Sequence, residues 1–173
     1  MRRISWTVAG AAVVAVVLTA TQAGAQASDA KAQAELASAL TVKHVSLARA
    51  LTSAASKGRP ISAKYEYADG KLQLSVYTER AGQFFEVIVN HRTGKVAKTD
   101  KITDADDLKN AKAQSQAIAR AKRSLKAAVA KALTDNPGYS SVSATATPNG
   151  GQPAAEITLL KGRAFKTVTE PLA

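Results

Sequence analysis

The sequence predicts an α+β fold in which a helix followed by a small antiparallel sheet occurs twice, after an N-terminal export signal. Three observations support this prediction. The chain opens with two arginines and a long uncharged, apolar run. Apolar residues then recur at helical spacing over 28–56 and again over 104–134. Each of these stretches is followed by alternating segments separated by turn residues, a pattern typical of antiparallel strands with one face in water.

Residues 1–27 have the features of a cleaved signal peptide. After the two arginines, residues 6–20 carry no charge. The sequences A-G-A and A-Q-A that follow both fit the pattern that a signal peptidase recognises, so cleavage is expected after Ala25 or Ala27. A retained anchor is the alternative, but a spanning helix needs about 20 apolar residues and this run is shorter. We therefore expect a periplasmic or secreted protein with no transmembrane helix after cleavage.

The composition narrows the classes of function. There is no cysteine, which excludes disulfide scaffolds, cysteine metal sites and cysteine nucleophiles. The 24 basic and 13 acidic residues give a formal charge of +11, and removal of the two signal arginines lowers it to +9. A strongly basic exported chain favours anionic partners. Because Trp6 is the only tryptophan, the processed protein should show no tryptophan fluorescence.

Residues 28–100 form the first predicted unit. The stretch 28–56 reads as one helix, ended by Gly58 and Pro60. Alternation over 61–67 and 71–76 predicts two strands, and the Asp69-Gly70 pair between them predicts a type I′ hairpin. A third strand is expected over 84–89 and a short edge strand over 95–98.

Residues 101–173 form the second predicted unit. The stretch 104–134 reads as one long helix, with Thr103 or Asp104 as its N-cap. Strands are expected over 139–147, 155–160 and 164–169.

The two units match at single positions as well as in their order of elements. Ser46-Leu47 aligns with Ser124-Leu125, Gly82 with Gly162, and Phe85 with Phe165. Units of this size are marginally stable alone. We therefore expect them to pack against each other or to share the long helix as a strut.

The stretch 45–96 carries a resemblance to a known family. After an alanine-rich helix it reads GRPISAKYEYADGKLQLSVYTERAGQFFEVIVNHRTGKV, with an apolar FFEVIVN strand and a closing TGKV turn. It resembles the PepSY domain, and residues 123–173 resemble a degenerate second copy, with Lys166 where Glu86 stands in the first. The resemblance implies a cystatin-like helix on a curled antiparallel sheet, secretion, and restraint of peptidases or other envelope enzymes. It implies no catalytic residues.

The polar residues do not predict an enzyme. A nucleophilic triad needs a base held by a third group, and the two histidines, His44 and His91, have basic neighbours and no nearby carboxylate. The acids Asp104, Asp106 and Asp107 fit helix capping better than a Ca²⁺ loop. No glycine-rich phosphate loop is present. We expect no catalytic residues, no metal site and no cofactor.

The predicted helix 104–134 carries an unusual run of basic residues with no acid between them. On one helix they would share one half of its circumference. Two interpretations stay open: a solvated face, or a docking surface for anionic lipid or wall polymer. Nucleic acid is not expected, because the run has no aromatic residue on which bases could stack. The candidate surface consists of Lys109, Lys112, Arg120, Lys122, Arg123, Lys126 and Lys131.

The predicted function is therefore a non-catalytic periplasmic PepSY-type binding module whose partner is an envelope protein, above all a peptidase. The alternative is a basic protein that binds an anionic envelope surface through 104–134. A second candidate surface is the exposed strand edge of the first unit, to which a partner could add a strand.

Overall fold

The computed structural model describes residues 21–173, so most of the expected signal peptide, with Trp6, lies outside the described residues. The helices and strands follow one another in the order helix, helix, four strands, helix, helix, three strands. Their bounds are α1 Thr21–Ala39, α2 Leu47–Ala54, β1 Arg59–Ala68, β2 Lys71–Arg80, β3 Gln83–Val89, β4 Val96–Lys101, α3 Ala105–Ala119, α4 Leu125–Asp135, β5 Ser140–Asn149, β6 Gln152–Lys161 and β7 Ala164–Pro171. The predicted α+β class is confirmed.

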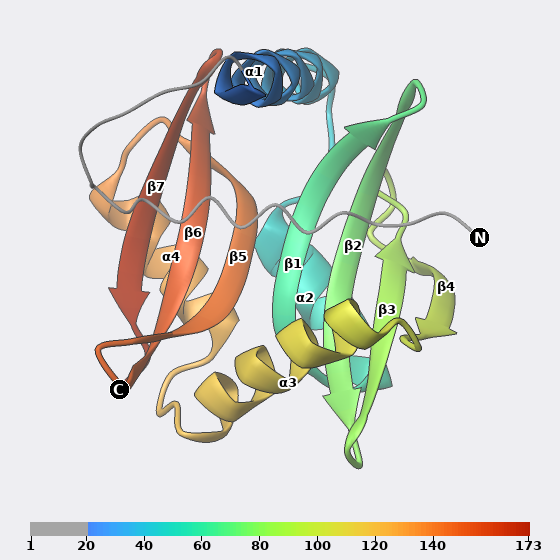
Figure 1. The fold of residues 1–173 in the computed structure, drawn as a ribbon, viewed down its shortest axis with the longest axis vertical. Coiled ribbons are helices and arrows are strands. Elements are labelled where there is room, and N and C mark those ends of the chain that lie inside the picture. The colour runs from blue at the N-terminus through green and yellow to red at the C-terminus, as the bar shows by residue number, and fades with distance from the viewer. Residues whose placement is uncertain (1–20) are drawn as a thin grey trace.

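All seven strands belong to one antiparallel sheet, in the order β4-β3-β2-β1-β5-β6-β7. The two groups of strands meet at β1 and β5, which pair only at Ser62 with Thr145, Ala63 with Ala144 and Lys64 with Ser143. Beyond these three pairs the strands diverge, as Figure 1 shows. The two small predicted sheets are therefore joined through a short central ladder.

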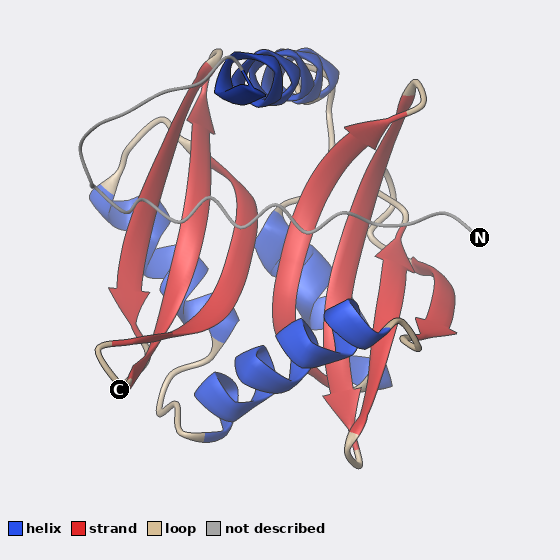
Figure 2. Cartoon of the chain, viewed as in Figure 1, coloured by secondary structure: helices blue, strands red, loops and turns tan. Residues whose placement is uncertain are grey.

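Helices cover both faces of the sheet (Figure 2). α2 and α4 lie together behind it in the view of Figure 1, whereas α3 crosses the front and α1 lies across one end. Strand alternation supplies the apolar rear face, and the buried side chains of both halves form one core cluster. One row of this core crosses the sheet from Val87 through Val76, Ala63 and Ala144 to Ile157, and all five side chains are fully buried.

The prediction of one helix over 28–56 is wrong. Within the described residues α1 spans Thr21–Ala39, and α2 begins only at Leu47. Ser46 ends the interruption as an N-cap, because its hydroxyl accepts a hydrogen bond from the Arg49 amide at 3.2 Å. The Val45 amide donates to the His91 carbonyl at 2.8 Å, and Tyr65 donates its hydroxyl to the Val45 carbonyl at 2.5 Å. These bonds hold the linker in a non-helical path.

The prediction of one long helix over 104–134 is also wrong. Asp104 caps α3 as expected, accepting from the Asp106 and Asp107 amides. The helix then stops at Ala119, and Ser124 caps α4 by accepting from the Ala127 amide at 3.2 Å. The amides of residues 122 and 123 both donate to the carbonyl of buried Leu172, at 2.7 and 3.1 Å. The shorter α3 nevertheless crosses the front of the sheet and contacts strands of both halves, β1 and β2 as well as β5 and β6.

The hairpins follow the turn chemistry of the sequence. Asp69 and Gly70 have φ of 51° and 72°, so both central residues take the positive φ of a type I′ turn. The strand expected over 95–98 extends to Lys101. One alignment needs correction: Phe165 pairs with Leu160 as Phe84 pairs with Glu79. Phe165 therefore takes the place of Phe84 in its hairpin, not that of Phe85.

Candidate functional site

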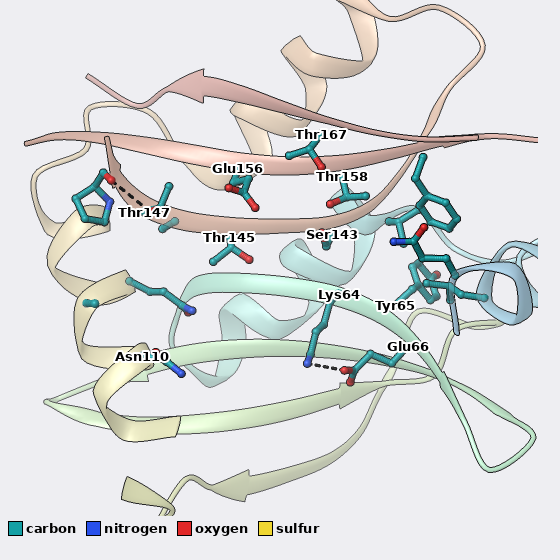
Figure 3. Close-up of a pocket in the computed structure, with 18 residues that line it drawn as sticks. Lys64, Tyr65, Glu66, Asn110, Ser143, Thr145, Thr147, Glu156, Thr158 and Thr167 are labelled. Carbon is teal, nitrogen blue, oxygen red and sulfur yellow. Dashed lines mark hydrogen bonds and ion pairs between the residues drawn. The ribbon is translucent and has the colours of Figure 1, made fainter. Parts of the chain in front are cut away.

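A groove of about 410 Å³ opens on the front face of the sheet, between α1 and α3 (Figure 3). Gln33 and Leu36 of α1 line one end, and Asn110 and Gln114 of α3 line another part of its wall. Its floor consists of side chains from β1, β5, β6 and β7. The volume is in the range typical of ligand sites.

The floor is polar because alternate residues of each strand face away from the core. In β5, Ser143, Thr145 and Thr147 line the groove, whereas the residues between them belong to the core cluster. The strand register extends this pattern into rows across the sheet. One row reads Lys64, Ser143, Thr158, Thr167, and the next reads Ser62, Thr145, Glu156, Thr169.

Glu156 supplies a carboxylate to this floor. It is half-buried on β6, directly opposite Thr145 on one side and Thr169 on the other. Figure 3 shows its side chain among Thr145, Thr158 and Thr167. Within the described chain, the carboxylate of Glu156 accepts no hydrogen bond and forms no ion pair. The groove therefore presents a negative charge surrounded by hydroxyl groups.

The charged side chains of β1 that line the groove neutralise each other. Lys64 forms an ion pair with Glu66 at 2.6 Å, and its ammonium lies 5.8 Å from the centre of the Tyr77 ring. Tyr77 donates to Glu86 at 3.1 Å. Burial raises the pKa of the Tyr77 hydroxyl, and the negative charges of Glu86 and Glu66 raise it further. The Lys64–Glu66 pair cancels its own charge, so Glu156 determines the net charge of the groove.

Gln114 adds a second unusual group to the wall. The residue is 7% exposed, and its amide oxygen has no hydrogen-bond partner within the described part of the chain. An unsatisfied buried polar group costs about 1–3 kcal/mol. A donor that enters the groove from the α3 side would offset that cost.

The two histidines are brought together by the fold, although the sequence placed them far apart. The charge of His44 acts on His91, and the His44 ring meets the Tyr65 ring edge-on at 5.3 Å. Burial lowers the pKa of His91, and the nearby Arg92 and His44 lower it further. The His91 carbonyl accepts from the Val45 amide and so holds the linker before α2 against the turn after β3, whereas the His44 ring packs on Tyr65 of β1. Among the residues described, no three His, Asp or Glu side chains group as metal ligands would.

The structure separates the seven predicted basic residues. All are exposed, but Lys109 and Lys112 lie on α3, in front of the sheet, whereas Lys126 and Lys131 lie on α4, behind it. Lys131 also forms an ion pair with Asp135. The expected single stripe along one helix is therefore wrong. The remaining three, Arg120, Lys122 and Arg123, lie in the connection between the two helices.

Sequence reasoning missed the groove and Glu156. The available signal was an acid inside the apolar strand expected over 155–160, together with the Ser/Thr alternation of the strand before it. Neither signal indicates a site alone, because the register that places Glu156 beside Thr145 and Thr169 is a property of the assembled sheet.

Comparisons with known proteins do not assign this chain to a family. No family model matches the chain, and no curated protein matches it. A crystal structure of a protein from Clostridium difficile 630, provisionally named a lipoprotein, is similar over 67% of this chain and 85% of its own. The sequence identity is 14% and the TM-score 0.32, so the likeness carries no argument about function. Within residues 21–173, no helix has both the length and the apolar character needed to cross a bilayer.

Proposed function

We propose that this protein is an exported, non-catalytic binding module that receives a segment of another envelope protein in the groove between α1 and α3. The observation that carries the proposal is the groove floor itself. Its strand side chains Ser143, Thr145, Thr158 and Thr167 engage in no side-chain hydrogen bond elsewhere in the described chain, so they are available to a ligand. The export features of the first 27 residues supply the compartment, periplasmic or secreted.

We further propose that the module is a tandem of two PepSY-type units, 28–100 and 101–173, that restrains a peptidase or another envelope enzyme. Support comes from the order of elements, which runs helix, helix and strands in both halves. The second helix of each half begins after a serine N-cap, Ser46 or Ser124. The three strands of the second half follow the same antiparallel order as the first three strands of the first half.

The test is capture of a partner from the native envelope by cross-linking, followed by inhibition assays on the secreted peptidases it identifies. Thr158→Trp should obstruct the groove and lower partner recovery at least tenfold. Thr134→Trp places the same ring on the exposed side of α4 and should leave recovery unchanged. Equal recovery with both variants would show that the partner binds elsewhere.

A second candidate function is binding to anionic lipid or wall polymer through basic side chains. It is favoured because six of the seven candidate basic residues, all but Lys131, are exposed and make no side-chain ion pair with the described chain. The structure divides them into a pair on α3 and a group around the start of α4. Reversal of Lys122, Arg123 and Lys126 to Glu should abolish binding to vesicles of anionic lipid. The matched variant reverses the charges of Lys109 and Lys112, the pair on α3. Binding that persists at high salt after both reversals contradicts this function.

A further inference from the structure

We infer that the groove selects an extended polypeptide segment carrying a lysine or arginine side chain, whose positive charge pairs with Glu156. This inference rests on the proposed binding of a protein segment in the groove and specifies its chemistry. Three features of the groove support it: an unpaired carboxylate, a floor of free hydroxyl groups, and a pair of strands that separate beside it.

The charge of the groove sets the sign of the ligand. The chain as a whole is strongly basic, with 24 basic and 13 acidic residues, yet the groove has the opposite sign. Lys64 and Glu66 neutralise each other, which leaves the carboxylate of Glu156. A half-buried carboxylate forms a stronger bond with a cation than a fully exposed one does, since water screens it less. A cationic group is therefore the complementary ligand, although the exposed surface of this protein favours anions.

The hydroxyl groups beside Glu156 can form hydrogen bonds with the backbone of a bound peptide. Each Ser or Thr hydroxyl can donate one hydrogen bond and accept up to two, so a row of them can serve both amide and carbonyl groups. Ser143, Thr158 and Thr167 form such a row across three strands, two residues along β6 from Glu156. Their methyl and methylene groups also offer apolar contact to the stem of a lysine or arginine side chain.

The divergence of β1 from β5 leaves backbone groups beside the groove. The two strands pair only over Ser62–Lys64 and Ser143–Thr145. The next residues, Tyr65 and Glu66 of β1 and Val142 of β5, line the groove without pairing to each other. Unpaired strand edges bind extended peptides by adding a strand. The amide oxygen of Gln114, which lacks a partner, offers one more acceptor on the α3 side.

The experiment uses amide NMR spectra of the ¹⁵N-labelled exported protein and two blocked pentapeptides, Ser-Ala-Lys-Ala-Ser and the same peptide with norleucine in place of lysine. The norleucine peptide keeps the length and apolar stem but lacks the charge. We expect the lysine peptide to shift the amides of residues 143–147 and 154–158 and to bind at least tenfold more tightly. In Glu156→Gln the two peptides should bind alike. In Asp29→Asn, which removes an exposed carboxylate on α1 outside the groove, the preference should persist.

The outcomes separate this inference from the proposed function. Equal binding of both peptides to the unaltered protein overturns the charge selection and leaves a peptide groove. No shift of the groove amides with either peptide overturns both. If n-butylammonium binds as tightly as the lysine peptide, or chitobiose binds more tightly, the ligand is not a polypeptide segment. Glu156→Lys with a glutamate peptide is the complementary test: a reversed preference supports the pairing, and an unchanged preference overturns it.

Discussion

Ser46 and Ser124 show how a single side chain fixes the start of a helix inside a stretch that otherwise reads as continuous. Each hydroxyl accepts a hydrogen bond from the amide three residues later, at 3.2 Å. Serine in a helix interior competes for backbone hydrogen bonds, and at an N-cap the same chemistry becomes stabilising. The alignment of Ser46-Leu47 with Ser124-Leu125 therefore matched two helix starts rather than two helix interiors.

We predict that Ser124→Ala lowers the free energy of unfolding by about 1 kcal/mol, because the Ala127 amide loses its acceptor. Ser124→Gly should cost only a few tenths of a kcal/mol, since glycine leaves the cap open to water. Urea unfolding followed by circular dichroism would measure both. Equal losses for the two variants would contradict the assigned cap.

Two buried tyrosines make the free energy of unfolding depend on pH, in a direction that follows from their raised pKa values. Burial raises the pKa of Tyr65 above the ordinary tyrosine value, and burial together with Glu86 and Glu66 raises that of Tyr77. The unfolded chain releases these protons from about pH 10, whereas the folded protein keeps them. The stabilisation is therefore complete below about pH 10 and is lost as the pH rises further.

We predict that the free energy of unfolding falls by about 1.4 kcal/mol per pH unit for each of these tyrosines above pH 10. Tyr77→Phe removes one ionisable group, so its unfolding free energy should fall less steeply than that of the unaltered protein. Urea unfolding at intervals between pH 9 and 11.5 gives the difference directly, because the lysines contribute equally to both proteins. Parallel curves would contradict the raised pKa.

At the scale of elements, the strands were predicted more closely than the helices. Residues 61–67, 71–76 and 84–89 all lie inside observed strands, because two-residue alternation and the Asp69-Gly70 turn are local signals. The helices were predicted too long, because nothing in the apolar spacing marks where a linker is held by distant partners. Those partners are His91 and Tyr65 for the first helix pair and Leu172 for the second.

The alanine-rich faces of α2 and α4 allow these helices to pack closely behind the sheet. Ala50 and Ala54 of α2 and Ala128 and Ala132 of α4 are all buried. A small residue at such a position contributes little buried area, but it sets the distance between the layers. The stability of these contacts depends on side-chain size more than on hydrophobicity.

We predict that Ala132→Leu lowers the free energy of unfolding by about 1–3 kcal/mol, because the larger side chain must displace packed neighbours. Ala130→Leu is the matched control, since Ala130 is exposed on the same helix; its effect should stay within about 0.5 kcal/mol. Thermal and urea unfolding of both variants would test the difference. A stabilised Ala132→Leu would mean that α4 has free space beneath it.

At the scale of the whole molecule, the two halves depend on each other although their strand pairing is brief. Only three residue pairs join β1 to β5, but α2 contacts α4 and the buried side chains of both halves form one cluster. Separation of the halves would expose that shared core. The pairing of β1 with β5 also positions the groove, because the groove floor is formed by β1 together with β5, β6 and β7.

We predict a single cooperative unfolding transition. Phe85→Trp and Phe165→Trp each place a fluorescent probe in one half of a protein that begins at residue 28, a stretch with no natural tryptophan. Because the core is shared, the urea midpoints reported by the two probes should coincide with each other and with that from circular dichroism. Separate midpoints would show that the halves fold as independent domains.

Three features could be predicted from the residue pattern alone: the α+β class, the hairpins, and the alternation that makes one face of each strand apolar and the other polar. These features depend on backbone preferences and on spacing within a few residues, which the sequence displays directly. Three other features emerge only when the chain is folded: the two sheets join into one, each expected long helix is broken, and the Glu156 carboxylate lies unpaired among hydroxyl groups. Each of these results depends on contacts between residues far apart in the chain, such as Ala63 with Ala144 and Lys122 with Leu172, whose partners no local pattern specifies.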